Sequence, residues 1–129
     1  MVVDTSALLA VFFNEFHGPW VVDRLTQSKT ALRMSSVNYA ETLILIKDRQ
    51  PELFENLRER IVLSPIRIVP PSQEQAEIAA DARLRYPLNL GDCFAYALAK
   101  EEGIALLTLD RDFRRTDLEL VLPRTRERI

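Results

Sequence analysis

The fold of this chain is decided by residues 1–9, which read MVVDTSALL. A short apolar, β-branched run ends on the carboxylate of Asp4 and passes through two hydroxyl residues into a second apolar stretch. This order predicts a strand followed directly by a helix, with Asp4 at the carboxyl end of the strand. Open α/β sheets bind their ligands at that end of their strands. Asp4 is therefore a first candidate for a functional residue, although taken alone it is explained equally well as a helix N-cap.

The composition indicates one compact domain over residues 1–129. Of its 129 residues 47% are hydrophobic and 28% charged, and the net charge of −2 gives no general attraction to nucleic acid or anionic lipid. The apolar run at 7–13 is too short to span a bilayer and no basic signal-peptide region precedes it, so we expect a cytoplasmic protein without membrane contact. With His17 and Cys93 as the single histidine and cysteine, multi-His or Cys/His zinc sites are excluded within the chain, and any metal would be held by oxygen. Cys93 is expected to be a buried thiol.

Helical and strand patterns alternate along the rest of the chain. Apolar periodicity predicts helices over 6–13, 18–25, 37–46, 52–63, 73–85 and 89–102, and β-branched runs predict strands over 31–34, 66–69, 104–108 and 118–122. Ser72 and Gln75 have the spacing of a capping box, and Gly103 is placed to end a helix. The strand at 66–69 is expected to be buried. The alternation predicts an α/β fold, a three-layer α/β/α sandwich with a mostly parallel sheet.

Acidic residues fall at the ends of these predicted elements. Asp4, Asp110 and Asp112 follow strands, whereas Glu41 and Asp92 lie in the first turns of helices. Carboxylates gathered in one cleft repel one another and raise each other's pKa unless a divalent cation neutralises them. Mg²⁺ or Mn²⁺ suits such a cleft, because hard cations take oxygen ligands and keep water molecules available for chemistry.

Each acid also has a structural explanation. Glu41 follows Asn38 at the spacing of a capping box, which would make its role structural if the other acids were absent. Asp92 would interact favourably with the dipole of its own helix, and Asp110 and Asp112 are residue types common in turns. Five such coincidences at one predicted edge are less expected than a single site.

Taken together, the motifs resemble those of the PIN-domain nucleases. The resemblance is carried by Asp4-Thr5-Ser6, by Glu41, by Gly91-Asp92 at the start of an alanine-rich helix, and by Thr108 through Asp110 to Asp112-Phe113. The length, and the position of the first motif, look like the VapC toxins of prokaryotic toxin–antitoxin pairs. The resemblance covers nearly the whole chain.

The resemblance implies a PIN-like fold and a Mg²⁺- or Mn²⁺-dependent endoribonuclease that hydrolyses RNA phosphodiester bonds. Asp4, Glu41 and Asp92 would be the core acids, with Asp4 and Asp92 contacting the metal and Asp110 or Asp112 as the last acid. Ser6 and Thr108 would be supporting hydroxyls. Glu41 or Asp110 would steer the attacking water or accept its proton. A VapB-like antitoxin and a homodimer are the implied partners.

Two other classes of protein do not match these motifs. A receiver domain needs a second acid after its first strand, and a haloacid-dehalogenase phosphatase needs an aspartate where Ser6 stands. The remaining alternative is a non-catalytic homodimeric binding module whose acidic cleft receives a basic peptide. Arginines near the carboxyl terminus fit an RNA backbone, an acidic partner or a solvated face equally well: Arg111, Arg114, Arg115, Arg124, Arg126 and Arg128.

Overall fold

The computed structural model describes residues 1–124, and within them the chain forms a five-stranded, all-parallel sheet in the order β3-β2-β1-β4-β5. Arg126 and Arg128 of the predicted arginine-rich tail lie outside the described residues. The strands are β1 (Val2–Val3), β2 (Leu32–Ser35), β3 (Ile66–Val69), β4 (Leu106–Leu107) and β5 (Leu120–Val121). The strand that carries Asp4 at its end is thus the central one.

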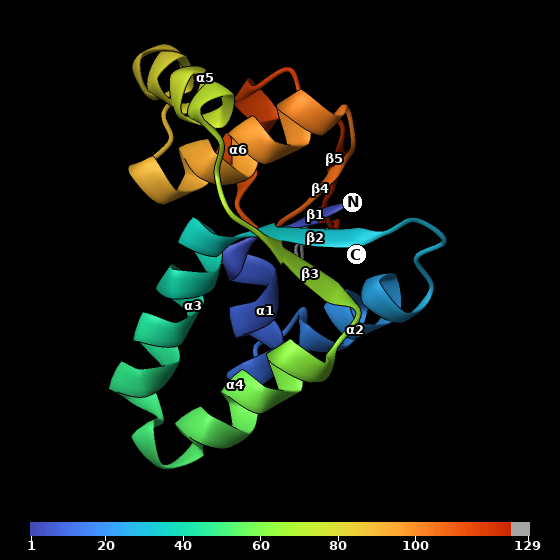
Figure 1. The fold of residues 1–129 in the computed structure, drawn as a ribbon. Helices are drawn as coiled ribbons and strands as arrows, with labels where there is room; N and C mark the ends of the chain where they lie inside the picture. Colours follow the sequence, from blue (N-terminus) through green and yellow to red (C-terminus); the bar gives the residue numbers. More distant parts are fainter. Residues whose placement is uncertain (125–129) are drawn as a thin grey trace.

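Helices cover both faces of the sheet, which confirms the predicted three-layer α/β/α sandwich (Figure 1). One face is covered by α1 (Thr5–Phe12), α2 (Gly18–Thr26), α3 (Ser36–Arg49) and α4 (Phe54–Leu63), and the other by α5 (Gln73–Arg85) and α6 (Leu90–Glu102). Short 3₁₀ turns occupy Pro51–Leu53 and Arg111–Arg115. No helix in the described part of the chain has the length and apolarity needed to cross a bilayer.

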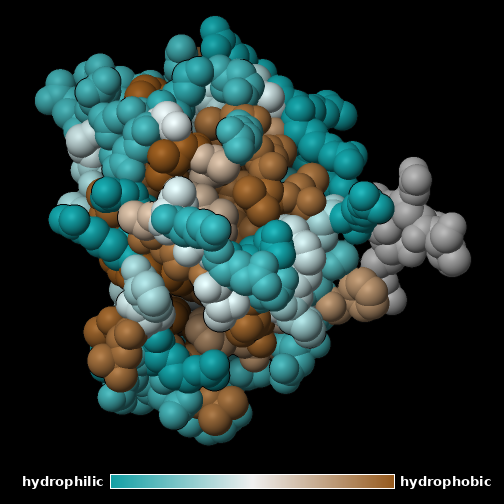
Figure 2. Space-filling view, turned by 90° about the vertical axis from the view of Figure 1, so that its right-hand side faces the viewer, coloured by the Kyte–Doolittle hydropathy of each residue, from teal (hydrophilic) through white to brown (hydrophobic). Residues whose placement is uncertain are grey.

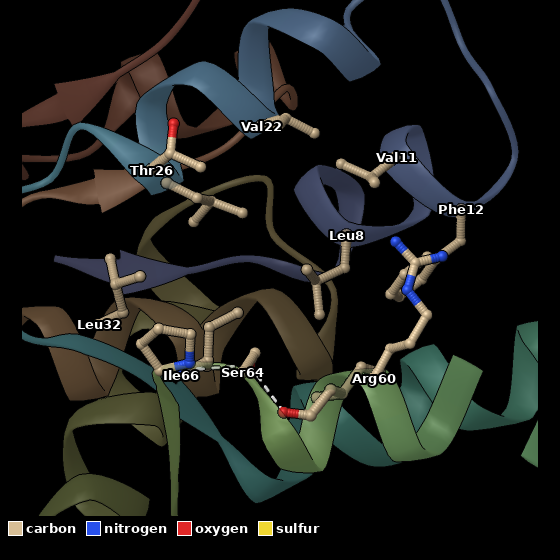
Figure 3. Close-up of a pocket in the computed structure, with 12 residues that line it drawn as sticks. Leu8, Val11, Phe12, Val22, Thr26, Leu32, Arg60, Ser64 and Ile66 are labelled. Carbon is tan, nitrogen blue, oxygen red and sulfur yellow. Dashed lines mark hydrogen bonds between the residues drawn. The ribbon is translucent and has the colours of Figure 1, made fainter. Parts of the chain in front are cut away.

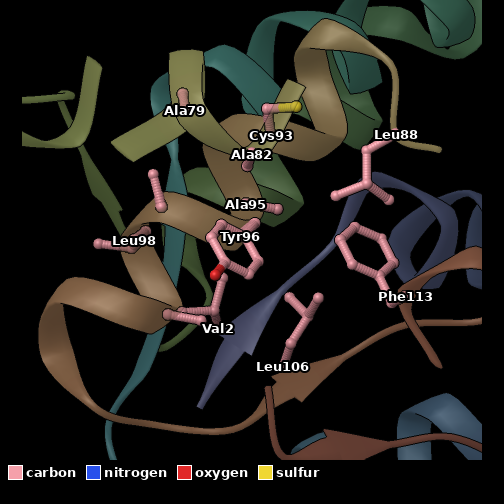
Figure 4. Close-up of a cluster of buried hydrophobic side chains, with 12 residues drawn as sticks. Val2, Ala79, Ala82, Leu88, Cys93, Ala95, Tyr96, Leu98, Leu106 and Phe113 are labelled. Carbon is pink, nitrogen blue, oxygen red and sulfur yellow. The ribbon is translucent and has the colours of Figure 1, made fainter. Parts of the chain in front are cut away.

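Alternation along the strands builds a separate core on each face. Val2 and its neighbour Leu106 pack under α6, whereas Val3 and Leu107 face α1 and α3. Successive side chains of a strand point to opposite faces, so both residues of such a short, doubly covered strand must be apolar. Figure 4 shows the α6-side core, in which Phe113, from the turn after β4, fills the space beside Leu106. Cys93 is fully buried in this core, as predicted.

The predicted helix ends are largely confirmed. The Ser72 hydroxyl caps α5 by accepting a hydrogen bond from the Gln75 backbone N–H, while the Gln75 amide donates to Glu101 rather than completing a capping box. Gly103 ends α6 with φ +66°, a left-handed conformation that glycine adopts without a steric penalty.

Two predictions about the elements differ from the structure. The strand at 66–69 was expected to be buried, but β3 is an edge strand that pairs only with β2, and Arg67 is exposed. The sheet order explains this, because β3 lies farthest from β1 on its side. The helix expected from residue 52 begins at Phe54, after the 3₁₀ turn that Pro51 opens.

Candidate active site

Asp4 stands at the N-cap position of α1, but other side chains hold its carboxylate. It lies between β1 and α1 with an extended backbone, and its carboxylate makes no capping hydrogen bond to α1. Instead, Oδ2 accepts hydrogen bonds from the hydroxyls of Ser6, at 2.9 Å, and Thr108, at 2.8 Å. The side chain is 2% exposed. Asp4 therefore occupies the N-cap position without capping through its side chain, and it is a buried carboxylate held by two hydroxyls.

The two hydroxyls also join Asp4 to the loop after β4. Ser6 Oγ accepts the Leu109 backbone N–H at 3.0 Å, and Thr108 Oγ1 accepts that of Asp110 at 3.0 Å. Each hydroxyl donates its single proton to Asp4 and accepts from the loop with a lone pair. The structure therefore brings both predicted supporting residues against Asp4 and fixes the neighbouring strand end beside it.

Glu41 projects from the first turns of α3 toward α1 and α6. Its Oε1 accepts from the Thr5 hydroxyl at 2.9 Å and from the Asn38 amide at 3.0 Å. The capping-box explanation of Asn38 and Glu41 is wrong, because the N-cap of α3 is Ser35, whose hydroxyl accepts the Val37 backbone N–H at 3.2 Å. Asn38 and Thr5 were not among the predicted functional residues. The separation of three residues between Asn38 and Glu41 was the available signal.

Asp92 combines a structural role with an unusual electrostatic setting. It forms a capping box with Asn89, because each side chain accepts the other residue's backbone N–H, at 2.8 Å and 3.3 Å. Burial, followed by the charge of Asp4, raises the pKa of Asp92 to about 7, and Asp110 and Glu41 add smaller contributions. Burial also raises the pKa of Asp4, against the lowering effect of its hydrogen bonds from Thr108 and Ser6. The carboxylates of four elements therefore act on one another.

The structure separates the two candidates for the last acid. The charge of Asp110 contributes to the raised pKa of both Asp4 and Asp92, so this carboxylate belongs to the group. Its Oδ1 also accepts the Asp112 backbone N–H at 2.9 Å and caps the following 3₁₀ turn. Asp112 is exposed and is not among the main influences on either pKa. The electrostatic influence on Asp4 and Asp92 favours Asp110 over Asp112 as the last acid.

The donor set fits an open cation site of the magnesium type. Within residues 1–124, no three Asp, Glu, His or Cys side chains already stand close enough together to hold a metal ion by themselves. Mg²⁺ is commonly bound through one or two carboxylates, with water and substrate phosphates completing its coordination. Asp4 and Asp92 offer oxygen only, and the rise that Asp4 causes in the pKa of Asp92 is the repulsion that a cation would relieve.

An apolar hollow lies away from the acids, beside the amino ends of β2 and β3. This apolar cavity of about 250 Å³ lies between α1, α2 and α4 (Figure 3), and its lining includes Leu8, Val11, Phe12, Val22, Leu32 and Ile66. At the edge of the cavity, the Arg60 guanidinium lies 5.5 Å from the centre of the Phe12 ring. Figure 2 shows the face of the molecule at the amino ends of the strands, where apolar patches alternate with hydrophilic ones.

The setting of Asp92 predicts a pH dependence of stability in metal-free protein. Because the pKa of Asp92 rises on folding, its stabilising contribution is complete below the unfolded pKa, near 4, and is lost as the pH rises through about 7. We expect the free energy of unfolding in urea with EDTA to be lower at about pH 8 than at about pH 5. The loss should be smaller in Asp92→Asn and unchanged in Asp23→Asn, an exposed control on α2. Equal loss in all three proteins would contradict this account.

Comparisons with known proteins identify the fold and the family. The PIN domain matches residues 1–119. Ribonuclease VapC42 of Mycobacterium tuberculosis is 33% identical over 127 residues, covering 92% of this chain and 96% of its own. Ribonuclease VapC of Mycolicibacterium smegmatis is 35% identical over 129 residues, covering 94% and 99%.

Solved structures agree with these relatives. The sarcin–ricin loop cleaving toxin VapC20 of M. tuberculosis superposes with a TM-score of 0.81 at 20% identity, covering 95% of this chain and 98% of that one. A chain of a toxin–antitoxin complex from Klebsiella pneumoniae gives a TM-score of 0.74 at 25% identity, over 93% and 94% of the two chains. The chain therefore belongs to the PIN-domain family, among the VapC ribonucleases, as its motifs predicted.

Proposed function

We propose that this protein is a Mg²⁺- or Mn²⁺-dependent endoribonuclease that acts as the toxin of a type II toxin–antitoxin pair. The observation that carries the proposal is the group of mutually repelling carboxylates at one edge of the sheet, with Asp4 buried and the pKa of Asp92 raised to about 7. Such an arrangement is unfavourable in a protein without a ligand, and it suits a divalent cation and an RNA phosphate. The VapC ribonuclease relatives support RNA as the substrate.

Asp4 and Asp92 are the proposed ligands of the cation. When bound, the cation supplies a Lewis acid that stabilises charge on the phosphate oxygens and makes water more acidic. The hydroxyls of Ser6 and Thr108 fix the orientation of the Asp4 carboxylate by hydrogen bonding to its Oδ2. Glu41 or Asp110 steers the attacking water or accepts its proton, as a carboxylate can do from hydrogen-bond distance.

The apolar cavity beside Arg60 is the proposed binding site for an antitoxin. Structural neighbours include a chain of a toxin–antitoxin complex from K. pneumoniae. We propose that a VapB-like antitoxin binds this protein, that apolar side chains of the antitoxin enter the cavity between α1, α2 and α4, and that a basic group reaches the acids. The homodimer implied by the motifs stays a prediction.

Asparagine substitutions test the metal site. We expect Asp4→Asn and Asp92→Asn to fold, because asparagine keeps the shape, but to lose RNA cleavage by a factor on the order of a hundred or more. The assay uses a pool of random-sequence RNA with Mg²⁺ or Mn²⁺, and with EDTA as the metal-free arm. Asp23→Asn is the matched control and should cleave like the wild type. Cleavage that persists in both site variants, or in EDTA, would refute the mechanism.

A second pair of variants decides the last acid. Because Asp110 acts on Asp4 and Asp92 while Asp112 is exposed, we expect Asp110→Asn to lower kcat/KM more than Asp112→Asn does. Asparagine at 110 can still cap the 3₁₀ turn, so a loss of activity there would not reflect a lost cap. An equal or larger loss in Asp112→Asn would reverse the assignment.

The antitoxin proposal is tested by a charge placed in the cavity. Val22 lines the cavity and is 43% exposed, so Val22→Glu should leave the fold intact while disfavouring an apolar segment. We expect this variant, co-expressed with its cognate VapB-like antitoxin, to lose co-purification of the antitoxin. Ile44→Glu, at an exposed position on α3 outside the cavity, is the control. Retention by Val22→Glu, or equal loss in the control, would place the antitoxin elsewhere.

A further inference from the structure

We propose that Asn38 is a positioning residue which, together with Thr5 and Gly91, sets the orientation of the Glu41 carboxylate for RNA cleavage. The inference rests on the proposed ribonuclease function. It assigns a role to side chains that touch Glu41 but are not themselves among the acids of the site.

The Asn38 amide joins Glu41 to the start of α6. Asn38 is fully buried, and its Nδ2 donates to Glu41 Oε1 at 3.0 Å and to the Gly91 carbonyl oxygen at 3.0 Å. The amide nitrogen carries two protons, one for each acceptor. The opposite orientation of the amide would place its oxygen against two acceptors, so the hydrogen-bond pattern itself fixes the assignment.

The other atom of the same amide argues against a purely stabilising role. Asn38 Oδ1 is buried and has no hydrogen-bond partner among the described residues. A buried acceptor left unpaired is unfavourable by about 1–3 kcal/mol. Stability alone therefore does not account for asparagine at this position. The Asn38 side chain instead binds Glu41 and the first turn of α6 at the same time.

Thr5 completes the set of donors to Glu41. Its hydroxyl oxygen lies 2.9 Å from Glu41 Oε1 and 3.2 Å from the Asn38 carbonyl oxygen. Thr5 directly follows Asp4, so this contact links the Glu41 carboxylate to the strand end that carries the buried acid. Both donors bind Oε1, and Oε2 is the oxygen that lies nearest to Gly91.

Gly91 provides the surface against which the carboxylate rests. A Cβ atom added at Gly91 would lie 1.9 Å from Glu41 Oε2 and 2.3 Å from its Cδ. Glycine has a lower helix propensity than alanine, so helix stability does not explain glycine at this position. The space it leaves does, because any side chain at residue 91 would displace the Glu41 carboxylate from its place next to Asp92.

The three contacts matter because the terminal torsion of glutamate is soft. Rotation about that bond has broad minima, so an unrestrained carboxylate would spread over many orientations. Displacing a reacting group by about 1 Å can reduce a rate on the order of a hundredfold. The contacts from Thr5, Asn38 and Gly91 remove this freedom before substrate binds.

Gly91→Ala separates positioning from stability. The three atoms nearest to the new methyl group all belong to the end of the flexible Glu41 side chain, so the protein should fold while Glu41 moves away. We expect kcat on the RNA pool to fall on the order of tenfold to a hundredfold, with KM within about threefold of the wild type. Asn38→Leu, which has a similar size but no donor, should lower kcat in the same way.

Thr42→Val is the matched control. Thr42 is fully buried on α3, and its hydroxyl donates to the Asn38 carbonyl oxygen at 2.8 Å and not to the Glu41 carboxylate. This variant loses a buried hydrogen bond near the same residue, yet it should keep kcat within about threefold. A purely structural role for this part of α3 would instead affect Thr42→Val and Asn38→Leu alike.

A Glu41→Gln background tests whether the effect passes through Glu41. We expect Gly91→Ala to cause no further loss of kcat there, because the residue being positioned is already inert. Unchanged kcat in both Gly91→Ala and Asn38→Leu would overturn the proposal. Equal losses in the wild-type and Glu41→Gln backgrounds, or a loss in Thr42→Val as large as in Asn38→Leu, would also do so. If Glu41→Gln has no measurable rate, the comparison of Gly91→Ala with Thr42→Val decides.

Failure of the proposed function would be recognised separately. Wild-type protein that cleaves no RNA with either metal refutes the ribonuclease proposal whatever the variants do. Crystal structures of wild type and Gly91→Ala then still test whether Thr5, Asn38 and Gly91 position Glu41. We expect Glu41 to keep its contacts with Thr5 and Asn38 in the first and to leave them in the second, and a Glu41 that stays in place in Gly91→Ala would overturn it.

Discussion

The burial of the Asp4 carboxylate at the end of the central strand is the constraint on which the rest of the site depends. A carboxylate removed from water is strongly unfavourable as an ion unless hydrogen bonds or a cation compensate it. Two hydroxyls, from α1 and from the end of β4, offset part of this penalty. Each of these hydroxyls also accepts a backbone N–H from the loop after β4. The geometry that tolerates Asp4 is therefore the geometry that brings the next strand end, and Asp110, to the same edge.

The order of the strands brings the other acids close to Asp4. Because β1 has β2 on one side and β4 on the other, elements that follow both neighbours begin beside Asp4. α3 leaves β2 and carries Glu41, the loop after β4 carries Asp110, and α6 brings Asp92 from the opposite layer. Nothing in the local sequence around any one acid requires this meeting. It follows from parallel pairing, which places all carboxyl ends at one edge.

Sequence reasoning could predict this meeting of elements but not the partners of individual side chains. The alternation of patterns and the positions of the acids were sufficient for the three-layer fold and for Asp4, Glu41 and Asp92 near one another. The role of Asn38 was misjudged because a separation of three residues suits both a capping box and a side-chain pair within a helix. Its contact with Gly91 spans 53 residues and depends on how α3 packs against α6. The edge position of β3 likewise depends on strand order, which a β-branched run does not encode.

Asp92 shows that structural and functional explanations of a residue need not compete. Its capping box with Asn89 satisfies backbone groups at the start of α6, and that alone would justify an acid there. Capping alone does not raise the pKa of a carboxylate, however, and the pKa of an exposed capping aspartate would not be raised by burial. Because the helix begins over the buried Asp4, the capping carboxylate is forced to share its surroundings with another negative charge. The preceding residue, Gly91, then makes room for a third carboxylate. Alanine at residue 91 would suit the helix but would meet the Glu41 carboxylate, so the first turn of α6 accommodates the acids as well as the cap.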